Sequence, residues 1–156
     1  MLTEKELSTD VEKYRTMLFR LAYSVTGDLS VCDDIVWDVF MKLYSSPPAF
    51  NSEEGKKAWL IRLTINKSHN HTKSKWQRSR TELSEAVYGE ETPVDDIIAL
   101  KEALKGLKPN YREVIFLHYY EGYTAAEIGK ILGISVTAVT TRLQRGREKL
   151  KTYLID

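Results

Sequence analysis

The sequence predicts an all-α fold, built from two small helical modules joined by a flexible linker. Apolar residues recur at the spacing of an amphipathic helix along most of the 156-residue chain. Residues 78–96 interrupt this pattern with a polar stretch that contains glycine and proline and is typical of a linker. Residues 123–151 carry the capping and turn signals of a helix-turn-helix. We therefore expect modules at 1–77 and 97–156.

Two helices are expected before residue 50. Apolar spacing predicts the first over 11–25. Its buried stripe would consist of Leu18, Leu21, Ala22 and Val25. The sequence Thr26-Gly27-Asp28 breaks this helix, and Ser30 is placed to cap a second one that continues to about Tyr44.

The second expected helix has one apolar face and one acidic face. Its core stripe would consist of Ile35, Val36, Val39, Phe40 and Leu43. Asp34 and Asp38 stand four residues apart, with Trp37 between them and Asp33 beside them. Catalysis by these carboxylates is disfavoured, because no nucleophile, oxyanion donor or cofactor loop accompanies them. A solvated face is the main alternative, but a large aromatic among charges favours a docking face for a basic partner.

A basic helix is expected next, over residues 58–76. The breaker Ser45-Ser46-Pro47-Pro48 and a polar loop at 50–57 precede it. Residues 56–81 contain 8 basic and no acidic side chains. Cations attract phosphates, and indole rings stack on unpaired bases. The alternative is a solvated basic helix; we expect Trp59 to lie in the core but the helix as a whole to bind nucleic acid.

The remaining residues with distinctive chemistry do not indicate a metal or redox site. His69 and His71 alternate with asparagine, but side chains two residues apart diverge on a helix and are poorly placed to share a metal ion. Cys32 is the only cysteine, which excludes an internal disulfide and a cysteine-based zinc cluster. We expect no metal, no cofactor and no enzymatic activity.

Charge is segregated along the chain, although the net charge is only +1. Residues 1–55 carry −5, residues 56–81 carry +8, residues 82–102 carry −6 and residues 103–156 carry +4. Such segregation indicates partners of both signs. No apolar run approaches the roughly 20 residues that a membrane helix needs, and the acidic N-terminus does not resemble a signal peptide. We expect a cytoplasmic protein without membrane insertion.

The second module should begin with two helices. Asp95 and Asp96 are placed to open one that carries Ile97, Ile98, Leu100 and Leu104. Pro109 suits the first turn of the next helix, expected over 110–121, because the amide hydrogen that proline lacks is not needed there.

The helix-turn-helix follows. Thr124 and Glu127 form a capping box, so a helix should begin at Ala125. Its buried face would consist of Ile128, Ile131 and Leu132. Gly133 is placed to end this helix, since glycine tolerates a positive φ. Ser135 is placed to cap the last helix.

The last helix has two chemically distinct faces. One narrow sector contains Val136, Val139, Leu143, Gly146 and Leu150. The opposite side contains Thr137, Thr141, Gln144, Arg145 and Glu148. Short polar groups and an arginine on an exposed helix fit a major groove and reach base edges. An ordinary helical hairpin with a solvated face is the alternative, which the caps, the short turn and the chemistry of the face disfavour.

With these segments defined, the chain resembles the extracytoplasmic-function (ECF) sigma factors, the smallest sigma subunits of bacterial RNA polymerase. The likeness extends from about Val11 to Lys151. The family's region four is similar to LKPNYREVIFLHYYEGYTAAEIGKILGISVTAVTTRLQRGREKL. The polymerase-docking part of its region two is similar to GDLSVCDDIVWDVFMKLY, and the promoter-melting part to AWLIRLTINKSHN. The chain departs from the family at Trp37, where glutamine is usual, and at Asn70, where aspartate is frequent.

The resemblance implies a sigma factor that binds core RNA polymerase, directs it to specific promoters and assists DNA melting. Docking on the clamp helices of the largest subunit would involve Asp33, Asp34, Trp37 and Asp38, and region four would dock on the flap of the second-largest subunit. Minus-35 contacts are expected from Thr137, Thr140, Thr141, Arg142, Gln144 and Arg145. Minus-10 recognition and melting are expected from Phe50, Lys56, Lys57, Trp59, Arg62, Asn66, Lys67 and Lys73. Among these, Asn66 and the loop at 50–57 would capture a flipped base. An anti-sigma factor is a further partner that the family allows.

Two other functions stay open on the sequence alone. A helix-turn-helix regulator that binds duplex DNA as a homodimer would need a dimer surface and a signal domain, which the acidic first module does not resemble. A helical interaction protein that antagonises a sigma factor would fit the acidic helix but not the groove-contacting helix.

Overall fold

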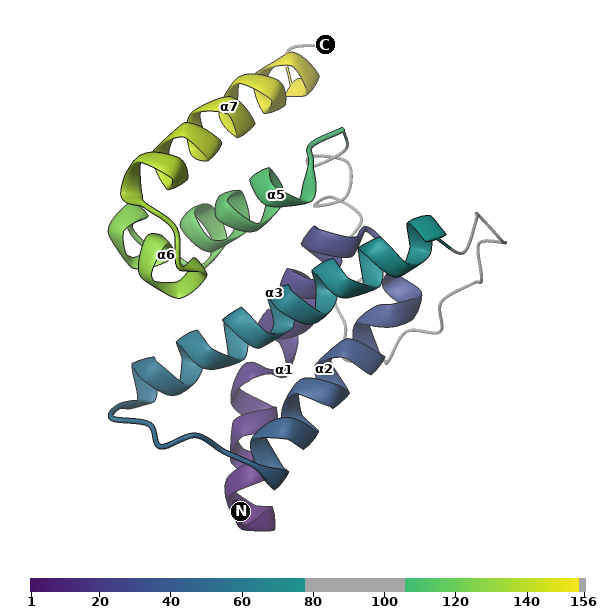
Figure 1. Cartoon of the computed structure of the whole chain (residues 1–156), viewed down its shortest axis with the longest axis vertical. Coiled ribbons are helices and arrows are strands. Elements are labelled where there is room, and N and C mark those ends of the chain that lie inside the picture. Colours follow the sequence, from purple (N-terminus) through teal and green to yellow (C-terminus); the bar gives the residue numbers. More distant parts are fainter. Residues whose placement is uncertain (78–105, 155–156) are drawn as a thin grey trace. The chain divides into compact units, whose positions relative to one another are not determined.

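The computed structural model describes residues 1–77 and 106–154, with side chains for 1–72 and 106–151. These residues belong to two compact units. Every regular element in the described ranges is helical, which confirms the predicted fold class (Figure 1). The expected linker at 78–96 and the helix expected to open at Asp95 lie outside the described residues.

The first unit, within residues 1–77, contains three packed helices, α1 (Glu4–Thr26), α2 (Leu29–Ser45) and α3 (Glu53–Gln77). Each of them contacts the other two, so they share one core. The fully buried side chains at its centre include Leu18, Leu21, Val25, Phe40, Leu43, Leu60 and Ile61. All residues of the two stripes predicted for α1 and α2 are buried, as the helical spacing requires.

Local capping makes α1 longer than the apolar pattern predicts. The helix begins at Glu4 rather than near Val11. Thr3 Oγ1 accepts a hydrogen bond from the Glu6 amide at 3.1 Å, and acidic residues in the first turn favour a helix N-terminus. The predicted break is confirmed, because Gly27 ends the helix with a φ of 66°.

The cap of α2 and the start of α3 also differ from expectation. Asp28, not Ser30, caps α2, since its carboxylate accepts a hydrogen bond from the Ser30 amide at 3.0 Å. α3 begins at Glu53, inside the segment expected to be a loop, where Ser52 Oγ accepts a hydrogen bond from the Gly55 amide at 3.0 Å. The remaining loop spans residues 46–52 and connects α2 to α3 as an open segment (Figure 1).

The second unit, as far as it is described, contains α5 (Pro109–Ile115), the π-helix η1 (Phe116–Tyr120), α6 (Ala125–Leu132) and α7 (Val136–Leu154). α7 contacts both α5 and α6. The shared core includes Leu107, Val114, Phe116, Leu117, Ile128, Val139 and Leu143.

The helix expected over 110–121 is divided in two. Pro109 occupies the first turn as predicted. Beyond Ile115 the chain winds as η1, and the Glu121 amide donates to the carbonyl of Phe116 at 3.2 Å, five residues back. This wider turn leaves two aromatic side chains more than half exposed, Tyr119 and Tyr120.

The caps predicted for the helix-turn-helix are confirmed. Thr124 Oγ1 accepts a hydrogen bond from the Glu127 amide at 3.1 Å, and the Glu127 carboxylate accepts one from the Thr124 amide at 2.9 Å. Gly133 ends α6 with a φ of 72°. Ser135 Oγ accepts a hydrogen bond from the Ala138 amide at 3.0 Å and so caps α7. These caps fix the relative direction of the two helices.

Two glycines allow close approach within this unit. A Cβ on Gly129 would lie 2.8 Å from the carbonyl oxygen of Ile134, and one on Gly146 would lie 3.0 Å from Ile115 Cδ1. The first contact is with backbone, so any larger residue at Gly129 would displace the turn. The second keeps α7 close to α5.

The apolar sector of α7 is shorter than predicted. Val139, Leu143 and Gly146 are buried and Leu150 is half-buried, but Val136 is 48% exposed. Val136 stands in the first turn of α7, and helical spacing alone does not indicate where the neighbouring helices stop covering that side.

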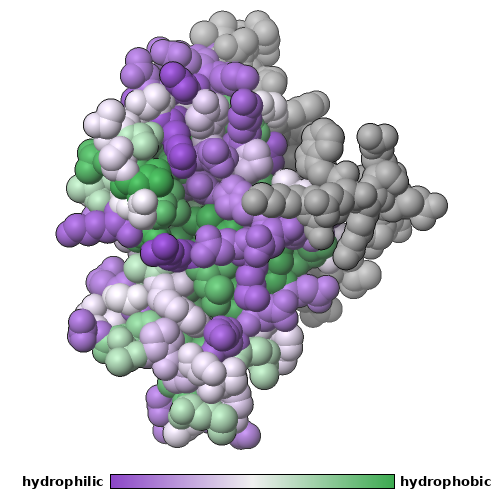
Figure 2. Space-filling view, viewed as in Figure 1, coloured by the Kyte–Doolittle hydropathy of each residue, from purple (hydrophilic) through white to green (hydrophobic). Residues whose placement is uncertain are grey.

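Among the described helices, none is long and apolar enough to cross a membrane. On the face seen in Figure 2, hydrophilic residues cover much of the surface and apolar residues show between them.

Candidate nucleic-acid and protein interfaces

The acidic face of α2 forms as the sequence predicts. Its exposed residues are Asp33, Asp34, Trp37 and Asp38. The Trp37 side chain is 61% exposed, and Met41, one turn later, is 37% exposed. Arg15 of α1 lies 3.7 Å from the Asp33 carboxylate. An apolar centre bordered by carboxylates suits a partner that presents both apolar and basic groups.

One stripe of α3 faces away from the core of the first unit. The buried side of the helix contains Leu60, Ile61, Thr64, Ile65 and Ser68. Trp59, Arg62 and Asn66 are spaced by three or four residues, so they share the opposite face. Arg62 and Asn66 are exposed, and Trp59 is half-buried. The stripe therefore combines an aromatic ring, a cation and an amide, which can contact a base and its phosphate.

The loop at 46–52 is attached to this stripe by an aromatic contact. Phe50 meets Trp59 edge to face, with ring centroids 5.7 Å apart and an interplanar angle of 66°. Trp59, which we expected to lie in the core, is instead half-buried and carries this contact. The contact brings Phe50 next to the exposed stripe, so two segments of the predicted minus-10 surface do lie together.

The lysines of the predicted minus-10 surface are distributed differently. Lys56 lies within hydrogen-bond distance of the buried Asp10 carboxylate, at 3.2 and 3.3 Å. Lys57 and Lys67 are half-buried. The Lys73 side chain lies outside the described residues. Asp10 was not predicted as a partner of Lys56, although its position on the same helical stripe as Tyr14 and Leu18 indicated a buried carboxylate.

The exposed side of α7 carries most of the predicted minus-35 residues. Thr137, Thr140, Gln144 and Arg145 are exposed, and Thr141 is half-buried. Their spacing places them along the side of the helix opposite Val139 and Leu143. Such a face, following a capped turn from α6, has the form of a recognition helix that enters a major groove.

Arg142, also predicted to contact DNA, is engaged within the protein. Its Nη1 lies 3.9 Å from Glu113 Oε1, and the Glu113 side chain is only 5% exposed. A buried carboxylate requires such a partner. Arg142 therefore connects α7 to α5, and the signal that sequence reasoning missed was a glutamate in the buried part of α5.

Metal-ligating residues do not gather among the side chains described for 1–72 and 106–151: no three His, Cys, Asp or Glu residues there could hold one ion. His71 lies instead near Asp28, with its Nε2 3.7 Å from the carboxylate.

Comparison with known proteins identifies the family. The family model described as Sigma-70 region 2 matches residues 11–78, and the one described as Sigma-70, region 4 matches residues 97–150. The ECF RNA polymerase sigma factor SigW of Bacillus subtilis (strain 168) is 28% identical over 163 residues, covering 94% of this chain and 87% of SigW. The chain belongs to the ECF sigma factors of the sigma-70 family.

Other comparisons agree with this sigma factor assignment. The ECF RNA polymerase sigma factor SigE of Mycolicibacterium smegmatis is 28% identical over 155 residues, covering 92% of this chain and 60% of SigE. The sigma factor RpoE of Bartonella quintana, solved in complex with the anti-sigma factor NepR, has the same fold, with a TM-score of 0.78 at 23% identity over 96% of this chain and 97% of that chain. CnrH, solved with the cytosolic domain of CnrY, gives a TM-score of 0.72 at 25% identity over 97% of this chain and 89% of that chain.

Proposed function

We propose that this ECF sigma factor acts in the cytoplasm as a non-enzymatic subunit of RNA polymerase holoenzyme, with its three surfaces in separate roles. The acidic face of α2 docks on the core enzyme. The stripe of α3 together with the loop at 46–52 holds the minus-10 region. The exposed side of α7 contacts the minus-35 element. The observation that carries the proposal is that two chemically different exposed surfaces lie on different helices of one small unit. The surface on α2 is acidic with an aromatic centre, and the one on α3 combines aromatic, cationic and amide side chains.

The α2 face supports docking because it offers both affinity and orientation. Trp37 and Met41 supply exposed apolar area, and Asp34 and Asp38 lie one turn apart beside them. Interface anchors are commonly aromatic, with charges at the rim that steer association. The clamp helices of the largest polymerase subunit are the docking partner that the family implies.

The α3 stripe supports base capture during melting. Asn66 is exposed and able to donate and accept hydrogen bonds on a base edge. Phe50 and Trp59 provide aromatic surface about two turns before it on the same side of the helix, and Arg62 provides a cation for the backbone. A base that leaves the duplex loses roughly a few kcal/mol of stacking energy. Stacking on an aromatic side chain recovers part of this energy.

The decisive experiment is single-round transcription with purified core polymerase and a promoter library. Enrichment of promoters with defined minus-10 and minus-35 elements is the expected result. The free protein should bind duplex promoter DNA weakly, because each unit is small and contact with both promoter elements must order the two units at once. Tight, sequence-specific binding without polymerase would support a homodimeric regulator. Inhibition of another sigma factor, with no promoter selection, would support an antagonist.

The solved relatives suggest one more partner. RpoE and CnrH were each solved with a second protein, and the protein bound to RpoE, NepR, is an anti-sigma factor. We propose that an anti-sigma factor also binds this chain and competes with core polymerase. Co-purification from its source, followed by competition with core enzyme, tests this directly.

A further inference from the structure

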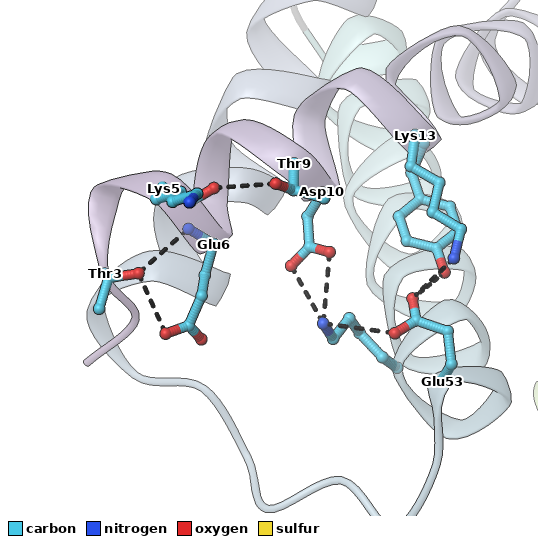
Figure 3. A network of polar contacts seen from close by, with 9 residues as sticks. Thr3, Lys5, Glu6, Thr9, Asp10, Lys13 and Glu53 are labelled. Atoms are coloured by element: carbon cyan, nitrogen blue, oxygen red, sulfur yellow. Dashed lines mark hydrogen bonds and ion pairs between the residues drawn. The ribbon is translucent and has the colours of Figure 1, made fainter.

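A polar cluster joins α1 to the first turn of α3, and we name it the α1–α3 clasp. It consists of Asp10, Lys13, Tyr14, Glu53 and Lys56 (Figure 3). Lys56 Nζ donates to both carboxylate oxygens of Asp10, at 3.3 and 3.2 Å. The side chains are 6% exposed for Asp10 and 20% for Lys56. This pair is therefore largely removed from water.

Glu53 forms the second half of the clasp. The Tyr14 hydroxyl donates to Glu53 Oε2, and Lys13 Nζ lies 3.4 Å from the same oxygen. Lys56 Nζ lies 3.7 Å from Glu53 Oε1, so it stands between two carboxylates. The hydrogen bond from Tyr14 holds the pKa of Glu53 below its usual range, and burial raises the pKa of Tyr14. Two ammonium groups and two carboxylates leave the cluster electrically balanced.

The position of the clasp connects it to the proposed minus-10 surface. Glu53 is the first residue of α3 and directly follows the loop at 46–52. Lys56 precedes Trp59 by three residues, and Trp59 carries the contact with Phe50. The clasp therefore fixes the end of the loop and the start of the stripe to α1. The residues that it joins are 39 to 46 positions apart in the sequence.

We propose that the clasp positions the loop at 46–52 and the α3 stripe for capture of a minus-10 base, and that Lys56 is a positioning residue rather than a phosphate ligand. This inference rests on the proposed function of the α3 stripe. Moving the Lys56 ammonium to a DNA phosphate would leave Asp10 charged, buried and without its cation, which is strongly unfavourable.

Two variants of opposite charge separate the two roles. Asp10→Asn removes a negative charge and Lys56→Gln removes a positive one. If Lys56 bound a phosphate, Lys56→Gln would weaken promoter binding and lower its salt dependence by about one unit of slope, whereas Asp10→Asn would leave binding equal or stronger. If the clasp positions the loop, both variants should slow opening of a duplex promoter about tenfold, with no change in salt slope. The double variant should then be no slower than either single one, because both remove the same interaction.

The readouts are holoenzyme formation, permanganate reactivity on duplex and pre-melted bubble templates, and preference among minus-10 sequences. A positioning role predicts normal holoenzyme, partial rescue on the bubble and weakened minus-10 preference for both variants. Arg62→Gln is the matched control, since Arg62 is exposed on the same helix and should lower the salt slope. Lys56→Arg should restore opening, because it keeps the cation near Asp10.

Tyr14→Phe keeps the proposal testable where Asp10→Asn or Lys56→Gln fails to fold. It removes only the hydrogen bond to Glu53 and should give a smaller opening defect in the same direction. Opposite effects of Asp10→Asn and Lys56→Gln would overturn the proposal. Normal promoter opening by all three variants would also overturn it, as would normal opening by Tyr14→Phe where the other two fail to fold. Asn66→Ala separates failure of the clasp proposal from failure of the proposed role of the α3 stripe. If holoenzyme with Asn66→Ala opens promoters slowly while the clasp variants open them normally, only the role of the clasp is refuted. If Asn66→Ala also opens normally, the proposed role of the α3 stripe is refuted.

Discussion

Two of the three arginines of α7, Arg142 and Arg145, should have opposite consequences when each is replaced. Arg145 is exposed on the proposed minus-35 face. Arg145→Ala should remove a base contact of about 1–3 kcal/mol, which lowers promoter use roughly fivefold to 150-fold. Its free energy of unfolding should change by no more than about 0.5 kcal/mol, because an exposed side chain away from core contacts contributes little to stability.

Arg142→Ala should show the reverse pattern. It deprives Glu113, whose side chain is 5% exposed, of a cation 3.9 Å away. Loss of a partner to a buried polar group costs about 1–3 kcal/mol. We expect the lower half of that range, since Arg142 is 27% exposed and the separation is long for an ion pair.

The assay compares both variants on promoters with an intact and a scrambled minus-35 element, in single-round transcription with core polymerase. Urea unfolding and core binding are measured on the same preparations. Arg145→Ala should lose only the higher transcription from the promoter with the intact minus-35 element. Arg142→Ala should unfold at a lower urea concentration but keep the same preference for the intact element. A stability loss for Arg145→Ala, or a selective minus-35 defect for Arg142→Ala at unchanged stability, would refute the assignment of the two faces.

Three further outcomes follow from the structure. Asn66→Ala should form holoenzyme and use the minus-35 element normally but open duplex promoters slowly, and a bubble template should relieve the defect in permanganate footprinting. Burial raises the pKa of the Cys32 thiol to about 12, so alkylation at neutral pH should be slow in the native protein and become fast in denaturant. Hydrogen bonds to the carboxylates of Glu53 and Glu127 lower their pKa values from 4.5, so the native state holds fewer protons than the unfolded state just below that pH. The free energy of unfolding should therefore fall as the pH drops below 4.5, and less steeply in Tyr14→Phe.

Much of the fold could be predicted because local signals and burial agreed. The stripe through Leu18, Leu21 and Val25 recurs at helical spacing and is fully buried. The capping box of Thr124 with Glu127 requires only residues close in sequence, and it forms. Where two good caps stood near each other, the prediction failed: Asp28 rather than Ser30 caps α2, because both residues have suitable side chains and only the backbone decides between them.

The candidate sites could be predicted by residue type but not by partner. The clasp joins residues about forty positions apart, so neither Lys56 nor Asp10 reveals its engagement from local sequence. The same holds for Arg142, which resembles a DNA contact in the pattern of α7 but faces Glu113 of α5. Cations in a basic segment therefore divide into those that are exposed, such as Arg62, and those that balance buried carboxylates, and only tertiary structure separates them.

The π-helix η1 has a consequence for how this segment tolerates changes in length. A π turn contains one residue more than the α turn it replaces. Removing one residue between Phe116 and Tyr120 would let this segment wind as a continuous α-helix, because the π turn accommodates the extra residue that the deletion removes. The aromatic pair Tyr119 and Tyr120 is exposed in the present winding. Which aromatic side chains this turn offers to solvent is thus controlled by the number of residues in it as much as by their identity.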